Sequence, residues 1–122
     1  MPKLILVVDD EDGIREVMAT LLLAEGYAVA TARHGVEALE KAQILSPQLM
    51  ILDMTLPLMD GHAVLEVIQD QPQWTDMGLL IMTASPVAYQ KVVARLGIAH
   101  CLAKPFDLDD LLTRIYRLIG LP

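Results

Sequence analysis

The sequence contains little cysteine, an excess of acidic over basic residues and no long apolar run. Cys101 is the one cysteine among 122 residues, so the chain cannot form an internal disulfide and has no second thiolate for a metal site. This cysteine usage agrees with a reducing compartment. Nine lysines and arginines are outnumbered by sixteen acidic residues, for a formal net charge of −7. That balance disfavours binding of nucleic acid through the general field of the surface.

No apolar stretch approaches the roughly 20 residues that a membrane-spanning helix needs. The first residues pass directly into acidic ones, without the small-residue cleavage site of a signal peptide. We therefore expect a cytoplasmic protein without membrane contact, whose partners are proteins, cations or small molecules. A chain of this length forms one ordinary domain, large enough for one buried core.

Five short apolar runs alternate with segments of helical periodicity. We expect strands near 4–8, 28–32, 49–53, 78–82 and 99–103, with the small-residue run at 28–32 on an edge of the sheet. Helices are expected at 13–25 and 36–45, from Asp60-Gly61 to 68, from a Ser85 cap to 96, and after an Asp107 cap. The alternation predicts an α/β protein in which right-handed βαβ units form a doubly wound parallel sheet.

Residues with chemical function follow four of the five runs. Asp9 and Asp10 follow the first run, Asp53 ends the third, Thr83 follows the fourth and Lys104 follows the fifth. Because the carboxyl ends of parallel strands meet at one edge, where open α/β sheets bind ligands, we expect these groups to lie together. We interpret Asp53, which ends an otherwise apolar run, as the reacting group.

Carboxylates placed close together repel one another, which raises at least one pKa unless a cation joins them. Mg²⁺ prefers oxygen ligands and keeps coordination positions open for water and phosphate oxygens. Lys104 would add a positive charge, and Thr83 a neutral hydroxyl donor. These groups are suited to attack by the Asp53 carboxylate on phosphorus, with an aspartyl phosphate as the product.

Taken together, these residues resemble the receiver domains of bacterial two-component response regulators, typified by the stand-alone chemotaxis regulator. The resemblance covers the whole chain and rests on the following motifs: Asp9-Asp10, Asp53 with the downstream Leu56-Pro57 and Asp60-Gly61, Thr83-Ala84, and Lys104-Pro105-Phe106. It implies a flavodoxin-like fold with five parallel strands in the order 2-1-3-4-5. It also implies that residues 1–122 are a single receiver domain, with no output domain.

The resemblance implies the function as well. Asp53 would accept a phosphoryl group from a sensor histidine kinase or a phosphotransfer protein, with Thr83 and Lys104 as the other catalytic residues. The domain would be a signalling switch with slow self-catalysed phosphotransfer and dephosphorylation, and not a conventional enzyme. Its phosphorylation would change a surface that binds a downstream effector protein or an output domain.

The same resemblance implies a Mg²⁺ site. Asp10, Asp53 and the backbone carbonyl of Thr55 would bind the ion, and Asp9 would help through water. The peptide bond between Lys104 and Pro105 is expected to be cis.

Cys101 departs from the family pattern, because it stands where the fifth strand carries an aromatic residue that moves during switching. We therefore hypothesise an output that does not use a rotating ring, such as a rearrangement of the helix after Ser85. Cys101 itself is expected to pack as a small apolar residue. We expect Arg95, Arg114 and Arg117 to be ordinary solvated charges.

Three other functions are compatible with parts of this pattern. An aspartate-nucleophile phosphohydrolase commonly has a second acid two residues after the nucleophile, where this chain has Thr55. A flavin-binding module needs a phosphate-binding loop after the first strand, whereas the acidic residues 9–12 would repel phosphate. A degenerate receiver that only docks partners is disfavoured because Asp9, Asp10, Asp53, Thr83 and Lys104 are all present.

Overall fold

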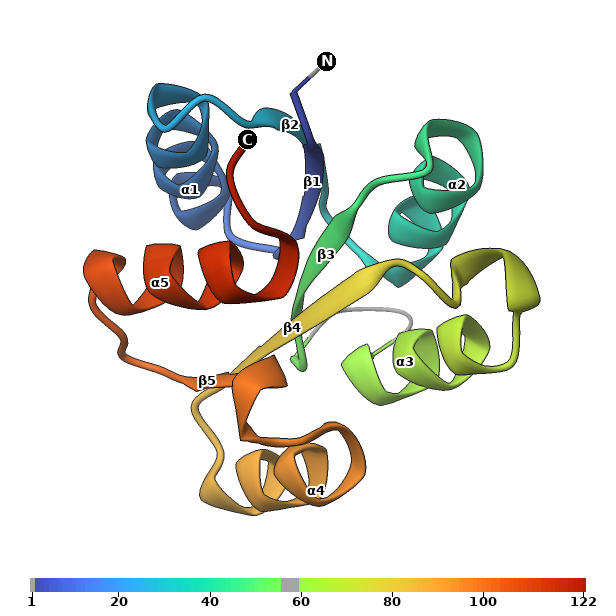
Figure 1. Ribbon diagram of the computed structural model, residues 1–122. Coiled ribbons are helices and arrows are strands. Elements are labelled where there is room, and N and C mark those ends of the chain that lie inside the picture. Colours follow the sequence, from blue (N-terminus) through green and yellow to red (C-terminus); the bar gives the residue numbers. More distant parts are fainter. Residues whose placement is uncertain (1, 56–59) are drawn as a thin grey trace.

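Five parallel strands form one sheet in the computed structural model, which describes residues 2–55 and 60–122 (Figure 1). The strands are β1 (Leu4–Val8), β2 (Ala28–Ala32), β3 (Leu49–Asp53), β4 (Gly78–Thr83) and β5 (Cys101–Ala103). Their order in the sheet is β2-β1-β3-β4-β5. This order and the parallel pairing confirm the predicted α/β fold, including the place of β2 at an edge.

The helices are α1 (Asp12–Ala24), α2 (Gly35–Leu45), α3 (Gly61–Gln69), α4 (Pro86–Leu96) and α5 (Leu108–Ile119). Figure 1 shows α1 and α5 on one face of the sheet and α2, α3 and α4 on the other. All five residues of β3 are buried, as expected for a strand covered on both faces. Among the described residues, none of the helices combines the length and the apolar character needed to cross a bilayer.

Alternating side chains of the strands divide the core into two clusters. Ile5, Val7 and Ile51 pack towards α1 and α5, whereas Leu6 and Leu52 pack in the cluster that contains residues of α2, α3 and α4. Each fully buried aliphatic side chain stabilises the fold by about 1.5–3 kcal/mol relative to an exposed one. The two clusters therefore hold the central strands in place, and with them the groups at the carboxyl edge.

The predicted caps Ser85 and Asp107 are confirmed, and Asp60 caps a third helix. Asp60, Ser85 and Asp107 each accept a hydrogen bond from a backbone N–H in the first turn of α3, α4 and α5. Each cap satisfies one of the amide groups that have no partner inside the helix. The Leu56-Pro57 motif lies outside the described residues.

The prediction for the fifth strand was partly wrong. β5 begins at Cys101, and residues Ile98–His100 form a short 3-10 helix, η2. This segment is held by contacts between side chains and main-chain carbonyls, in place of the backbone hydrogen bonds of a strand pair. The Nδ1 atom of His100 lies 2.8 Å from the carbonyl oxygen of Leu79, and Arg114 donates to the carbonyl of Ile98 at 2.6 Å.

Candidate functional site

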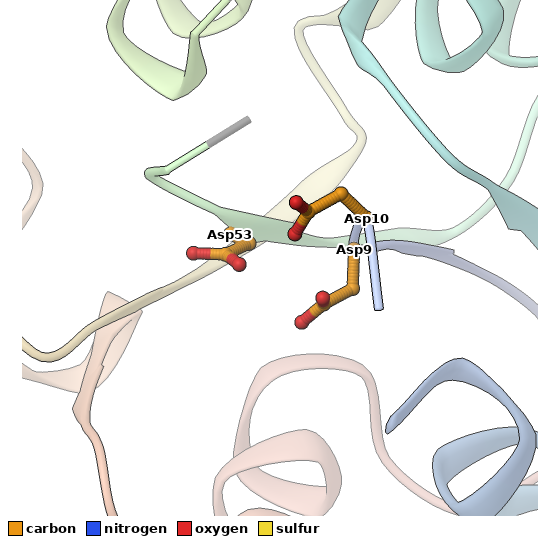
Figure 2. Close-up of side chains that lie close together, drawn as sticks. All are labelled: Asp9, Asp10 and Asp53. Carbon is orange, nitrogen blue, oxygen red and sulfur yellow. The ribbon is translucent and has the colours of Figure 1, made fainter. Parts of the chain in front are cut away.

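Three carboxylates meet where β1 and β3 end (Figure 2). The register pairs Val8 with Leu52, so the next residues along the two strands are Asp9 and Asp53. Together with Asp10, each of these residues offers a carboxylate oxygen, and the three oxygens lie within 4.8 Å of one another. Asp9 is 0% exposed and Asp53 is 5% exposed, whereas Asp10 is exposed. The structure thus brings together the acidic residues that the sequence predicted.

Lys104 reaches this cluster from the segment after β5. Its Nζ atom lies 3.2 Å from Oδ2 of Asp53 and 3.5 Å from Oδ2 of Asp9. The peptide bond between Lys104 and Pro105 is cis, as predicted. One lysine therefore stands against two buried carboxylates, with a third carboxylate nearby.

Hydrogen bonds fix one oxygen of each buried carboxylate. Oδ1 of Asp53 accepts from the backbone N–H of Thr55 at 3.1 Å, and Oδ1 of Asp9 accepts from that of Glu11 at 3.0 Å. Oδ2 of Asp9 is buried and has no hydrogen-bond partner among the described residues; its closest cation, Lys104, is at ion-pair distance. A buried carboxylate oxygen without a hydrogen bond lowers the stability of the folded state unless a cation lies close to it.

Burial and the neighbouring charges shift the pKa of both Asp53 and Lys104. Burial raises the pKa of Asp53, and the Asp9 carboxylate raises it further, against the lowering effects of the Thr55 amide and Lys104. Burial alone would lower the pKa of Lys104, but attraction to Asp53 and Asp9 outweighs it and raises that pKa. The two shifts therefore have different main causes, which are burial for Asp53 and attraction to the two carboxylates for Lys104.

The donor set fits a hard divalent cation. It consists of carboxylate oxygens from Asp9, Asp10 and Asp53, the ligands that Mg²⁺ prefers. The unpartnered Oδ2 of Asp9 provides a buried negative atom that such a cation would compensate.

Thr83 and Thr55 lie at the same edge. Thr83 ends β4, is 3% exposed, and accepts the backbone N–H of Ser85 at its Oγ1 atom at 3.0 Å. Its strand neighbour Met82 pairs with Asp53. Thr55 is exposed, and its amide bonds Asp53 as described above.

Two arginines have contacts that the sequence did not indicate. Arg114 was expected to be a solvated charge, and this prediction was wrong, because it is half-buried and donates to the carbonyls of Ile98 and Cys101. Arg15 in α1 donates to the carbonyl of Asp9 at 2.8 Å. The acceptors are main-chain carbonyls, which leave no mark in the sequence. Cys101 is 0% exposed within the apolar core, as predicted.

Comparisons with known proteins agree with this geometry. Residues 5–116 match the response regulator receiver domain family. The alkaline phosphatase synthesis transcriptional regulatory protein PhoP of Bacillus subtilis (strain 168) is 37% identical over 116 residues, which are 94% of this chain and 48% of PhoP. The chain spans about half the length of the curated relatives it matches.

Two solved structures extend the likeness over nearly the whole chain. The chemotaxis response regulator CheY4 of Vibrio cholerae is 33% identical with a TM-score of 0.86, over 97% of this chain and 99% of CheY4. The receiver domain of the sensor histidine kinase PA1611 from Pseudomonas aeruginosa PAO1, with a magnesium ion coordinated in its active site cleft, is 26% identical with a TM-score of 0.87, over 98% and 99% of the two chains. From its sequence, its strand order and its acidic edge, the chain belongs to the response regulator receiver domain family of two-component systems.

Proposed function

We propose that this chain takes a phosphoryl group onto Asp53 from the phosphohistidine of a sensor histidine kinase or a phosphotransfer protein. Receiver domains of response regulators are signalling switches and not conventional enzymes, and the proposal gives this chain that role. One observation carries it. The buried carboxylate of Asp53 ends a strand with Lys104 at 3.2 Å and with the carboxylates of Asp9 and Asp10 beside it.

In the proposed transfer, a carboxylate oxygen of Asp53 attacks phosphorus while the bond between phosphorus and the imidazole nitrogen breaks. The electron pair of that bond returns to the imidazole, which leaves neutral when its other nitrogen carries a proton. The product is an aspartyl phosphate. Lys104 is placed to stabilise the charge that moves from Asp53 onto the phosphoryl oxygens. Thr83, whose oxygen already accepts the Ser85 amide, keeps its hydroxyl hydrogen to donate.

Receiver domains bind Mg²⁺ at their acidic site, and the receiver domain of PA1611 holds a magnesium ion there. For this chain we assign Asp10, Asp53 and the main-chain carbonyl of Thr55 as ligands, with Asp9 acting through water. The ion would supply positive charge to the carboxylates and to the phosphoryl oxygens. The same pocket would admit water to the aspartyl phosphate, so that slow self-catalysed dephosphorylation belongs to the proposal.

Phosphorylation would switch the domain through its change of charge. A phosphoryl group adds about −1.5 to −2 charges, which would draw Thr83 and Lys104 towards it. Cys101 is buried in the same core cluster as Val92 of α4 and has no ring to rotate, so we propose that a shift of α4 transmits the signal. Backbone amide NMR shifts with and without beryllofluoride would test this. Shifts confined to the phosphate pocket would contradict it.

The signal would pass to a downstream effector protein or an output domain. We place this function in the cytoplasm, where response regulators generally act. Direct binding of nucleic acid or of a membrane is not part of the proposal for these residues.

The deciding experiment is incubation with acetyl phosphate and Mg²⁺, followed by intact mass measurement. We expect one added phosphoryl group in the unaltered protein and none in Asp53→Asn. Asp70→Asn is the matched control, because Asp70 is exposed at the end of α3, and it should be phosphorylated normally. A gain that persists in Asp53→Asn, or rapid multiple turnover of an added phosphoester, would overturn the proposal.

A further inference from the structure

Arg15 holds the loop that presents the acidic residues, although it has no part in the proposed phosphotransfer. Its Nη1 atom donates to the main-chain carbonyl of Asp9 at 2.8 Å, and its Nη2 atom donates to Oδ1 of Asp12. The side chain is 12% exposed. We propose that Arg15 is a positioning residue, which holds the Asp9–Asp10 segment in the conformation that binds a divalent cation. This inference rests on the proposed function.

The hydrogen bond from Arg15 affects both Asp9 and Asp10, because its acceptor belongs to the peptide unit between them. The carbonyl of Asp9 belongs to the peptide unit that joins Asp9 to Asp10. A peptide unit is planar, so its orientation sets ψ of Asp9 and φ of Asp10 together. The guanidinium of Arg15 therefore fixes the direction in which both side chains leave the backbone.

Other contacts hold Asp9 on its remaining sides. Its amide donates to the carbonyl of Ala32 at 3.1 Å, and its Oδ1 accepts from the amide of Glu11 at 3.0 Å. The remaining atom is Oδ2, which is buried without a hydrogen-bond partner among the described residues and lies 3.5 Å from Nζ of Lys104. With the other polar groups of Asp9 engaged, this one oxygen remains for a cation or a water that the cation binds.

The start of α1 depends on the same contacts. Glu11 is the residue that precedes the helix, and its side chain makes no capping hydrogen bond. Asp12 is the first residue of the helix and bonds Arg15. The loop and the helix are thus joined through Asp9, by the Glu11 amide on one side and by Arg15 on the other.

An arginine suits this task better than a lysine. Its planar guanidinium donates in two directions at fixed angles, whereas an ammonium is a point charge on a flexible stem. Asp12 is 83% exposed, and such an exposed ion pair adds little stability. The pair with Asp12 instead orients the guanidinium towards the carbonyl of Asp9.

The sign of the effect separates positioning from simple charge. Removal of a positive charge near an acidic cluster makes the local potential more negative, which by Coulomb's law strengthens binding of a cation. Loss of a positioning contact has the opposite effect, because the carboxylates no longer converge. Substitution of residues that orient metal ligands typically lowers metal affinity about 10–100-fold.

The test is the Mg²⁺ dissociation constant, measured by calorimetry on the metal-free protein, together with the free energy of unfolding in EDTA. We expect Arg15→Met to bind Mg²⁺ about tenfold more weakly. Arg15→Lys keeps the positive charge but lacks the planar guanidinium, and it should bind with an intermediate affinity. Arg33→Met is the control, because it removes the same charge from a side chain that is 66% exposed and bonded to neither aspartate. It should bind as tightly as the unaltered protein, or slightly more tightly.

Unchanged or tighter Mg²⁺ binding by folded Arg15→Met would overturn the inference, even if that variant were less stable in EDTA. If Arg15→Met does not fold, the comparison rests on Arg15→Lys, and an affinity equal to that of the unaltered protein would then overturn it. Failure of the unaltered protein to bind Mg²⁺ or to be phosphorylated would instead contradict the proposed function. The two failures are thus distinguishable.

Discussion

The two edges of the sheet handle their polar groups in opposite ways. At the amino edge, Lys3 donates to the carbonyl of Ile119, and the hydroxyl of Tyr27 donates to that of Gly120 at 2.7 Å. Gln48 bonds Leu4 through both its side chain and its backbone. Figure 1 shows the segment after α5 close to the start of β1. At the carboxyl edge, three carboxylates lie together, Lys104 pairs with two of them, and one buried oxygen of Asp9 is left without a hydrogen bond.

The contrast separates stability from function. Each contact at the amino edge joins a donor to an acceptor, so removal of a side chain there costs stability and nothing else. At the carboxyl edge like charges are held together, and the fold bears their repulsion. A substitution that removes one of those negative charges should stabilise the protein and end its function. Stability and activity are commonly opposed in this way at sites where function requires strain.

Removal of Lys104, which pairs with Asp9 and Asp53, should have the largest effect on stability. Lys104→Met leaves Asp53 and Asp9 buried without a counter-charge, and breaking a buried pair in this way costs about 3–5 kcal/mol. We expect a loss near the lower end, about 3 kcal/mol, because the lysine side chain is 22% exposed. Urea unfolding at pH 7 in EDTA measures it.

Lys91→Met is the matched control, since Lys91 is exposed on α4 and its loss should leave the free energy of unfolding almost unchanged. Mg²⁺ should restore part of the stability of Lys104→Met, because it brings positive charge to the same carboxylates. A loss no larger than that of Lys91→Met would show that the two edges do not differ as described.

Neutralisation of an acid at the same edge should act in the opposite direction. Asp53→Asn removes a charge from a buried and incompletely paired group, and we expect the free energy of unfolding in EDTA to rise by about 1–3 kcal/mol at neutral pH. The pKa of Asp53 is raised in the folded protein, mainly by burial, so the folded state binds the proton more tightly than the unfolded chain. The carboxylate therefore destabilises the fold increasingly as pH rises through that raised pKa.

The gain from Asp53→Asn should accordingly be absent below the unfolded pKa, near 3.8, and develop as the pH increases. Urea titrations of both proteins from acidic to neutral pH measure the difference. Asp70→Asn, in an exposed position, should show no such pH-dependent gain. A neutral-pH loss of stability in Asp53→Asn would mean that Lys104 more than compensates the acidic cluster.

Local sequence patterns predicted much of the fold and most of the carboxyl edge. The bounds of β1 and β3 follow from short apolar runs, because burial on both faces leaves no polar alternation. Those of β2 follow from a run of small residues, although this edge strand is mostly half-buried. Asp9, Asp53 and Lys104 could be found because each ends or directly follows a strand, and parallel strands end at one edge. The strand order was not contained in the periodicity and came from the resemblance to the receiver family.

The two wrong predictions, for the start of β5 and for Arg114, share a cause. β5 begins later than predicted, and in the residues before it His100 contacts the carbonyl of Leu79 in β4 while Arg114 donates to the carbonyl of Ile98 in η2. Arg114 is therefore a structural residue. Arg15 likewise binds a carbonyl. Every residue has a carbonyl group, so the choice of acceptor depends on tertiary placement and leaves no pattern in the sequence. Asp12 and Arg15 are three residues apart in one helix, a spacing at which side chains can interact, but this spacing does not indicate the contact of Arg15 with a carbonyl.

The smallest predicted effect tests the amino edge alone. Tyr27→Phe removes the hydroxyl that donates to Gly120 and keeps the ring in the core, so it should cost about 1 kcal/mol of unfolding free energy, the usual net value of one hydrogen bond. Its Mg²⁺ affinity and its rate of phosphorylation by acetyl phosphate should equal those of the unaltered protein. Tyr116→Phe, at a residue that is 54% exposed, is the control for loss of a hydroxyl. A changed Mg²⁺ affinity in Tyr27→Phe would mean that the hydrogen bond between Tyr27 and Gly120 affects the acidic cluster. The two edges would then be coupled through α5.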